Sequence, residues 1–280
     1  MRLPPQTQPL VEVTQHIYII AYKEQTDQLE SYLFREGLSV KLLRQSPNPE
    51  QADFSPSYLC LLNHKRAWQD IVDTQQIGLV VEADFIPVQG FGQLPLSFPI
   101  KDPRVGIAWL YTCAPQIYSV SDAGFAEGYS TSMVAYILTP KAAQALIELS
   151  EQVRANIGPC NYSTWDSSID SFLRERSFKN YVPFRNYGEH GGIPNLEHKQ
   201  FGLSKVHRAD VLYGSLAFTP IYAQGKQQNW GLLSDRLQAR IKGIGRLVLG
   251  KYLRPAICLE SSYSLRLLKW AIGRHLTLRI

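Results

Sequence analysis

Short apolar runs alternate with helical segments over residues 17–120 of the chain. Helical spacing of apolar residues follows the first run and recurs at about 58–72, before the third run. Strand, helix, strand, helix and strand in this order predict right-handed crossovers and a mainly parallel sheet, and therefore an α/β fold. Three runs suit strands that are buried on both faces: 17–22, 38–43 and 79–81.

The amino-acid composition of the chain is that of an ordinary globular protein. Apolar residues make up 45% of the chain and charged residues 19%, which excludes wholesale disorder. No apolar run approaches the roughly 18 residues of a membrane span, and the N-terminus lacks the apolar core of a signal peptide, so the cytoplasm is the expected compartment. The four cysteines form no CxxC pair, so neither a zinc knuckle nor a disulfide framework is expected: Cys60, Cys113, Cys160 and Cys258.

The positive charge of the chain is concentrated at its C-terminal end. Residues 231–280 contain ten Lys or Arg and two acidic residues, a net charge of +8, whereas the preceding residues carry −3. Apolar residues recur there at helical spacing, so we expect a domain over 1–225 and a basic, amphipathic helical tail over 226–280. Such a tail suits peripheral contact with the inner face of an anionic membrane, or packing on the body with a solvated charged face. No nucleic-acid-binding signature accompanies the charge.

Two carboxylates end the third apolar run. Glu82 and Asp84 follow residues 79–81, where the carboxyl end of a parallel strand would meet a ligand. Residues i and i+2 of an extended chain point to the same side, so the two carboxylates can converge on one cation. Hard oxygen ligands suit Mg²⁺ or Mn²⁺, which can bridge protein and phosphate. The alternative is a pair of acids that are solvated at a strand end.

Two helical segments add polar groups that suit catalysis. His64 and Lys65 lie on the helix before the acidic strand and could donate hydrogen bonds to a diphosphate, or simply form a solvated helix face. Asp166 and Asp170 lie one helical turn apart, and a carboxylate there could act as a general base. The alternative for Asp166 is compensation of the helix dipole, which explains Asp170 less well.

A glycine-rich loop near residue 190 carries further candidate ligands. Gly191 and Gly192 let the backbone approach a ligand closely, and with Asn195 they are candidate contacts to a nucleotide. His190 and His198 could complete the ligand shell of the cation. The alternative is a structural turn.

The order of these features resembles glycosyltransferase family 25, the lipopolysaccharide-type sugar transferases. This resemblance implies a GT-A-like fold with a mostly parallel central sheet flanked by helices, a nucleotide-sugar donor and a divalent cation held by an acidic motif. Glu82 and Asp84 match that motif, and Asp170 matches a late aspartate of the family. The resemblance covers roughly 15–215 and rests on five segments: 17–20, 60–64 with Trp68, 79–84, 135–143 and 168–173.

The chain also departs from the family pattern. Ala83 stands where the family has a middle acid, and Glu24 and Gln28 stand where it typically has arginines. These departures favour a rival interpretation, a non-catalytic, eroded glycosyltransferase-like protein that binds glycans or nucleotide sugars during polysaccharide assembly. A third interpretation, a metal-dependent hydrolase, lacks the H-x-x-x-H or H-x-H spacing of such sites.

The expected function is a metal-dependent transfer of a sugar from a nucleotide-sugar donor to a hydroxyl of a glycan or lipopolysaccharide-type acceptor. A bound Mn²⁺ or Mg²⁺ would neutralise the diphosphate that leaves. His64, Lys65 or the backbone at Gly191 and Gly192 would donate to the phosphates. Asp170 is the expected base.

Overall fold

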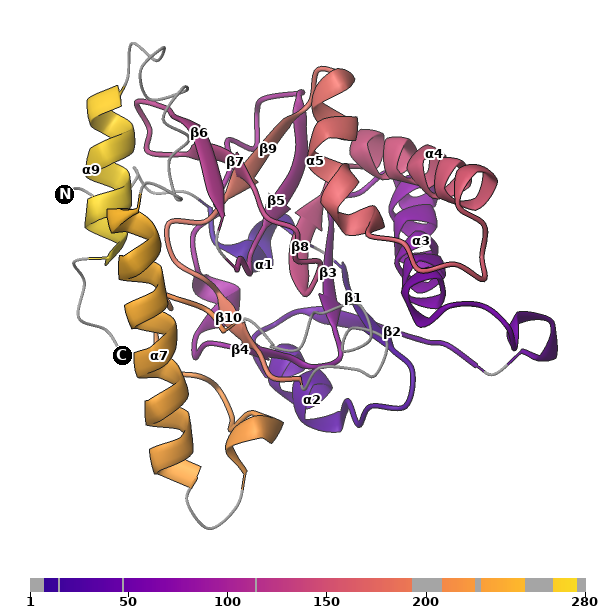
Figure 1. Ribbon diagram of the computed structural model, residues 1–280, viewed down its shortest axis with the longest axis horizontal. Coiled ribbons are helices and arrows are strands. Elements are labelled where there is room, and N and C mark those ends of the chain that lie inside the picture. The colour runs from indigo at the N-terminus through magenta and orange to yellow at the C-terminus, as the bar shows by residue number, and fades with distance from the viewer. Residues whose placement is uncertain are drawn as a thin grey trace.

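The computed structural model describes residues 8–14, 16–46, 48–113, 115–192, 208–224, 228–249 and 264–275. They form an α/β fold with an eight-stranded sheet through the centre and helices on both of its faces (Figure 1). The α/β class predicted from the sequence is thereby confirmed. The sheet order is β2 (Ser39–Arg44), β1 (His16–Ala21), β3 (Gly78–Glu82), β8 (Ala135–Leu138), β5 (Val105–Trp109), β9 (Lys179–Val182), β7 (Ala126–Tyr129) and β6 (Gln116–Val120).

Parallel pairing links the strands that the three apolar runs predict. β1 pairs in parallel with both β2 and β3, and β5 pairs in parallel with β9, whereas the remaining pairs in the sheet are antiparallel. The carboxyl ends of β1, β2 and β3 therefore lie at one edge. A short antiparallel ribbon of β4 (Phe85–Pro87) and β10 (Gly188–His190) continues from the end of β3.

Three helices cover one face of the sheet: α3 (Pro56–Thr74), α4 (Pro140–Asn156) and α5 (Trp165–Glu175). Ser55 and Thr139 accept hydrogen bonds from the first turns of α3 and α4, and a proline occupies the first helical position of each, which is the usual start of a helix. Alternate residues of β1 point to opposite faces, so Tyr18 packs under α3 and Ile17 packs on the other side.

Short elements cover the opposite face: α1 (Leu10–Val13), α2 (Asp27–Arg35) and the 3-10 turn η2 (Phe91–Gln93). Two other 3-10 turns, η1 (Pro49–Gln51) and η3 (Ile221–Ala223), lie in connecting segments. Leu10, Leu29 and Leu33 are buried against this face.

Two helices form the described part of the C-terminal tail, α7 (Gln228–Val248) and α9 (Ser264–His275). They lie along one side of the molecule, α9 above α7 in the view of Figure 1. The predicted helical tail is therefore present, whereas a domain boundary at 225/226 stays a prediction. Within the described part of the chain, none of the helices combines the length and apolar character needed to span a bilayer.

Candidate metal centre

Backbone pairing holds the acidic pair at the carboxyl edge of the sheet. Glu82 is the last residue of β3, and its N–H donates to the carbonyl of Val134 at 2.9 Å. The N–H of Ala83 donates to the carbonyl of Ile20 in β1 at 2.8 Å. Asp84 then forms the turn into β4. The two carboxylates thus stand where the sequence predicts them.

The β4–β10 ribbon brings His190 to this pair. His190 pairs with Phe85, the residue after Asp84, and the N–H of Gly191 donates to the carbonyl of Asp84 at 2.7 Å. The His190 Nε2 and Asp84 Oδ2 atoms are 2.9 Å apart. Glu82, Asp84 and His190 each offer one ligand atom, and these atoms all lie within 4.8 Å of one another. The predicted convergence of two carboxylates and a distant imidazole is present.

Charge couples Asp84 to His190. Burial raises the pKa of Asp84, but the charge of His190 and its hydrogen bond outweigh burial, so this pKa lies below its usual value. Burial likewise lowers the pKa of His190, but Asp84 outweighs it and the net shift is upward. The pair therefore favours a carboxylate beside an imidazolium, and binding of a cation at Nε2 would displace that proton.

The donor set fits a divalent cation. Asp84 Oδ1 is buried and has no hydrogen-bond partner within the described residues, so one carboxylate oxygen is left without the contact that a buried polar atom requires. A Cβ at Gly192 would overlap Asp84 Oδ2 and lie 3.1 Å from His190 Nε2, so only glycine lets the backbone pass this close. Carboxylate oxygens and an imidazole suit Mn²⁺, and the carboxylates suit Mg²⁺.

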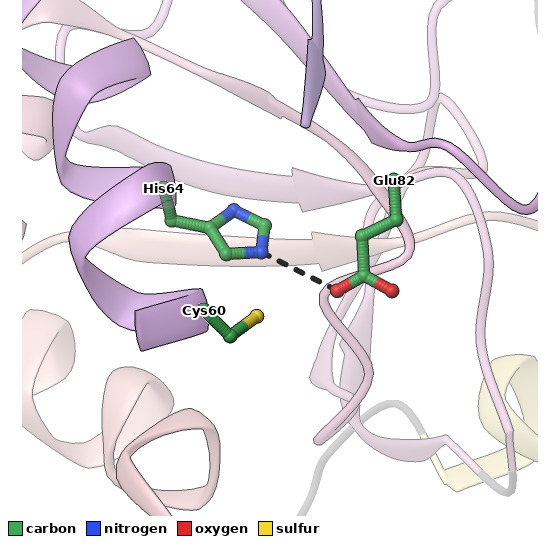
Figure 2. Close-up of side chains that lie close together, drawn as sticks. All are labelled: Cys60, His64 and Glu82. Atoms are coloured by element: carbon green, nitrogen blue, oxygen red, sulfur yellow. Dashed lines mark hydrogen bonds and ion pairs between the residues drawn. The ribbon is translucent and has the colours of Figure 1, made fainter. Parts of the chain in front are cut away.

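His64 lies on the other side of Glu82, within a chain of hydrogen bonds. The indole N–H of Trp68 donates to Tyr136 Oη at 2.8 Å, and Tyr136 Oη lies 2.9 Å from His64 Nδ1. Because that oxygen already accepts from Trp68, the arrangement that satisfies every group sends the tyrosine proton to Nδ1 and the His64 Nε2–H to Glu82 Oε1, 3.3 Å away (Figure 2). Both ring nitrogens are engaged, so His64 is placed to orient Glu82 and not to contact a phosphate as predicted.

Cys60 completes this side of the site. Its thiol lies one helical turn from His64 on α3 and faces the same carboxylate (Figure 2), and one ligand atom from each of Cys60, His64 and Glu82 falls within 4.8 Å of the others. Burial, reinforced by the negative charges of Glu82, Asp166 and Asp84, raises the pKa of the Cys60 thiol. The thiol stays protonated beside the acids, so the Asp84 side offers the better ligands for a hard cation.

Lys65 does not reach the acidic edge as predicted, and its neighbour Arg66 lies beside a cavity. The Lys65 ammonium pairs with Glu151 of α4, away from the acidic edge. The Arg66 guanidinium instead donates to the carbonyl of Arg44 at 3.1 Å, at the carboxyl end of β2. A cavity of about 410 Å³ lies there, lined by Gln45, Ser46, Asn48, Gln51, Leu62, Asn63 and Arg66.

Asp170 is not brought to the acidic pair. It is buried on α5, where it accepts hydrogen bonds from the hydroxyl of Tyr118 at 2.7 Å and the side-chain amide of Asn180 at 2.9 Å. The side chain of Asn180 accepts a hydrogen bond from the N–H of Ile107. Ile107 and Gly78, the first residue of β3, both pair with Leu138 of β8, so Asp170 lies near the start of β3. Glu82 stands four residues further along that strand, which is about 13 Å at the usual rise per residue.

The charge of Asp166 acts on a residue beside the acidic pair. Its negative charge contributes to the raised pKa of Cys60, to which Glu82 and Asp84 also contribute. Burial raises the pKa of the Cys113 thiol to about 11. The charge of Arg246 opposes this rise, whereas the charge of Asp166 adds to it. The aspartate in the first turn of α5, and not the predicted one a turn later, therefore shares the electrostatic environment of the acidic pair.

Sequence reasoning missed the residues that hold the His190 loop. Glu189 is fully buried, and its carboxylate accepts hydrogen bonds from the N–H of His190, the N–H of Ala209 and the guanidinium of Arg236. Arg208 donates to the carbonyls of His190 and Gly192. These are isolated charges without a local motif, and no pattern in the sequence connects them. Asn195 and His198 lie outside the described residues.

Comparison with known proteins adds structural likenesses only. No protein family and no curated protein matches the sequence. A glycosyltransferase involved in the glycosylation of the major capsid of PBCV-1 is similar with a TM-score of 0.39 and 10% identity, over 59% of this chain and 80% of that one. A mutant Drosophila beta-1,4-galactosyltransferase 7 in complex with manganese, UDP-Gal and xylobiose is similar with a TM-score of 0.35 and 11% identity, over 67% and 74%. Neither likeness assigns a family.

Proposed function

We propose that the chain is a GT-A-like glycosyltransferase that takes a nucleotide-sugar donor and a divalent cation. The observation that supports this most is the convergence of Glu82, Asp84 and His190 at the carboxyl edge of β3, with one buried oxygen of Asp84 left without a partner among the described residues. Ligands of open α/β sheets bind at this edge. A Mn²⁺ or Mg²⁺ bound there supplies positive charge that stabilises a departing diphosphate.

The residues around the acidic pair have different roles in binding. His64 orients Glu82 through the hydrogen bond at its Nε2, and His190 holds Asp84. The exposed Arg66 borders the 410 Å³ cavity at the end of β2, a volume within the range of small-molecule sites. A guanidinium at that position suits the phosphates of a nucleotide, so we place the nucleotide in this cavity.

Asp166 is the proposed general base. It would accept the proton of an acceptor hydroxyl while the hydroxyl oxygen forms a bond to the anomeric carbon and the sugar–phosphate bond breaks, so that a nucleoside diphosphate leaves. Asp170 then has a positioning role, because its hydrogen bonds to Asn180 fix α5 on β9. A hydroxyl of a glycan or of a lipopolysaccharide-type glycolipid is the proposed acceptor.

Donor hydrolysis tests the proposal. The full chain is incubated with a panel of nucleotide sugars with and without Mn²⁺, and the release of nucleoside diphosphate is measured. Metal-dependent release that Asp84→Asn abolishes, while Asp73→Asn on the exposed face of α3 does not, supports the proposal. Metal-dependent release that survives Asp84→Asn would overturn the role of Asp84.

Variants of the two aspartates of α5 distinguish the general base from the residue with a positioning role. Asp166→Asn is expected to lower the turnover rate roughly 100-fold or more with little change in thermal stability. Asp170→Asn is expected to lower stability, since it weakens the buried contacts to Tyr118 and Asn180. A normal turnover rate in Asp166→Asn would remove it as the base.

One observation favours a second candidate function. Ala83 lies between Glu82 and Asp84, where the resembled family has a third acid, so the site carries one negative charge fewer. A protein of this kind could bind nucleotide sugars or glycans in polysaccharide assembly without transferring them. Saturable donor binding with neither hydrolysis nor transfer to any acceptor would support this alternative.

A further inference from the structure

The helix α7 packs on the body with two arginines facing inward and a row of apolar side chains facing outward. Arg236 and Arg240 are buried, at 4% and 8% exposure, and face the body. Six apolar side chains with exposures of 44–79% occur every three or four residues, so they share one side of the helix. We call them the apolar stripe: Trp230, Leu233, Leu237, Ile241, Ile244 and Val248.

A buried ion pair and buried hydrogen bonds fix the direction in which the apolar stripe points. The Arg236 guanidinium donates to Glu189 at 2.6 Å and to the carbonyl of Ala209 at 2.7 Å. The Arg240 guanidinium donates to the carbonyl of His275 in α9 at 2.8 Å. Turning α7 to bury the stripe would break these contacts and leave the carboxylate of Glu189 buried without its partner, which strongly destabilises a protein. The stripe therefore stays on the surface.

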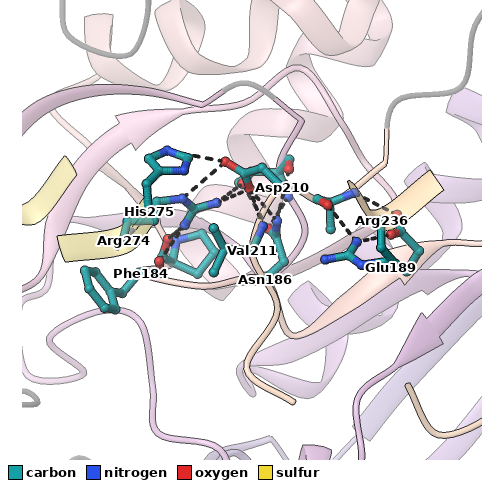
Figure 3. Close-up of polar contacts among 11 residues, drawn as sticks. Phe184, Asn186, Glu189, Asp210, Val211, Arg236, Arg274 and His275 are labelled. Atoms are coloured by element: carbon teal, nitrogen blue, oxygen red, sulfur yellow. Dashed lines mark hydrogen bonds and ion pairs between the residues drawn. The ribbon is translucent and has the colours of Figure 1, made fainter. Parts of the chain in front are cut away.

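The second tail helix extends this surface. In α9, the fully buried Arg274 bonds to Asp210 at 2.7 Å and to the carbonyls of Pro183 and Phe184, which fixes the rotation of the helix (Figure 3). Its exposed apolar side chains again recur at helical spacing. The helices α7 and α9 contact each other along one side of the molecule, and the exposed apolar side chains of α9 are Leu265, Leu268 and Ile272.

Charge decides what this surface contacts. Lys242 and Lys269 are exposed on the two helices, whereas the buried arginines of the tail face the body. A second copy of the chain would place these lysines against lysines of the same kind, and a nucleic acid offers no partner for a row of apolar side chains. An anionic lipid surface takes both, since apolar side chains enter between the headgroups while lysines and arginines pair with lipid phosphates. We propose that α7 and α9 dock on an anionic membrane through the apolar stripe.

Vesicle binding tests this docking. The full chain is mixed with phosphatidylcholine vesicles with or without phosphatidylglycerol, and the bound fraction is measured by co-sedimentation. The variant with Leu237→Ser, Ile241→Ser and Ile244→Ser is expected to lose roughly tenfold or more in affinity for the anionic vesicles. Phe34→Ser, which removes a still more exposed apolar side chain from α2, is expected to bind as the unaltered chain does.

A spectroscopic readout locates the contact. Trp68, Trp109 and Trp270 are buried, whereas Trp230 is 74% exposed at the start of the stripe. Brominated lipid in the anionic vesicles is expected to quench part of the tryptophan emission of the unaltered chain, and Trp230→Phe is expected to remove that part. Equal binding by the serine variant, or a dimer in solution that the serine variant dissociates, would overturn the proposal.

Discussion

The imidazole Nε2 of His190 lies 2.9 Å from Oδ2 of Asp84, although 106 residues separate them along the chain. Two features produce this contact. The β4–β10 ribbon aligns the backbones, and glycine at 192 leaves room for the carboxylate. Glu189, the neighbour of His190, is bonded to Arg236 of the tail (Figure 3). The geometry of the candidate metal centre therefore depends on the strand end, the ribbon and the C-terminal helix together.

A methyl group at residue 192 is expected to weaken cation binding. In Gly192→Ala the new Cβ would overlap Asp84 Oδ2, so the carboxylate must move away from His190. We expect the affinity for Mn²⁺, measured by titration calorimetry, to fall roughly 10- to 100-fold, the usual effect of disturbing a ligand's support. Gly214→Ala is the control, because a Cβ there meets nothing within 4 Å. Equal affinities in the two variants would contradict the proposed ligand role of Asp84.

Removal of the Tyr136 hydroxyl is expected to weaken the site through His64. Tyr136→Phe leaves the indole N–H of Trp68 and Nδ1 of His64 without their partner, so the free energy of unfolding should fall by about 1–3 kcal/mol. Glu82 also loses its oriented donor, and Mn²⁺ affinity should fall with it. Tyr22→Phe, at an exposed tyrosine, should change neither quantity. Lower stability with unchanged Mn²⁺ affinity would show that the hydrogen-bond chain has a structural role only.

Loss of the Arg236 charge is expected to destabilise the protein strongly. Arg236→Met leaves the carboxylate of Glu189 buried without its ion-pair partner, which typically costs about 3–5 kcal/mol. Lys41→Met breaks the exposed pair with Asp70 and should cost at most about 1 kcal/mol. Urea unfolding monitored by circular dichroism compares them. Similar midpoints for the two variants would mean that the tail helix contributes little to the stability of the body.

Acid is expected to destabilise the fold through His275. Burial, with the positive charges of Arg274 and Arg240, lowers the pKa of His275 from 6.5 to about 4, although Asp210 opposes the shift. Between these values the unfolded chain binds a proton that the folded chain does not bind. The free energy of unfolding should therefore fall by about 3 kcal/mol as the pH decreases from about 6.5 to about 4.

A matched pair of variants isolates this histidine. His275→Gln is expected to lose that part of the pH dependence, whereas His16→Gln on β1 is expected to keep it. The free energy of unfolding is measured at several pH values between 4 and 7 for each. An unchanged slope in His275→Gln would show that other groups carry the acid sensitivity.

Local patterns in the sequence determined the parallel core and the place of the acids. Apolar runs and helical spacing define β1, β2 and β3, and Glu82 at the end of β3, with Asp84 in the turn that follows, lies at the edge where ligands bind. The period of a strand and the direction of parallel pairing are properties of a few consecutive residues. This is why the core of the candidate site could be predicted.

Tertiary structure alone decided which neighbouring side chain faces the site. Lys65 pairs with Glu151 of α4 whereas Arg66 bonds at the end of β2, and the Asp170 carboxylate accepts a hydrogen bond from Asn180 of β9, because partners from distant segments set how each helix packs. The outward stripe of α7 has the same cause. Turning the stripe inward would leave Glu189 buried without Arg236, and these two residues are separated by 47 positions along the chain.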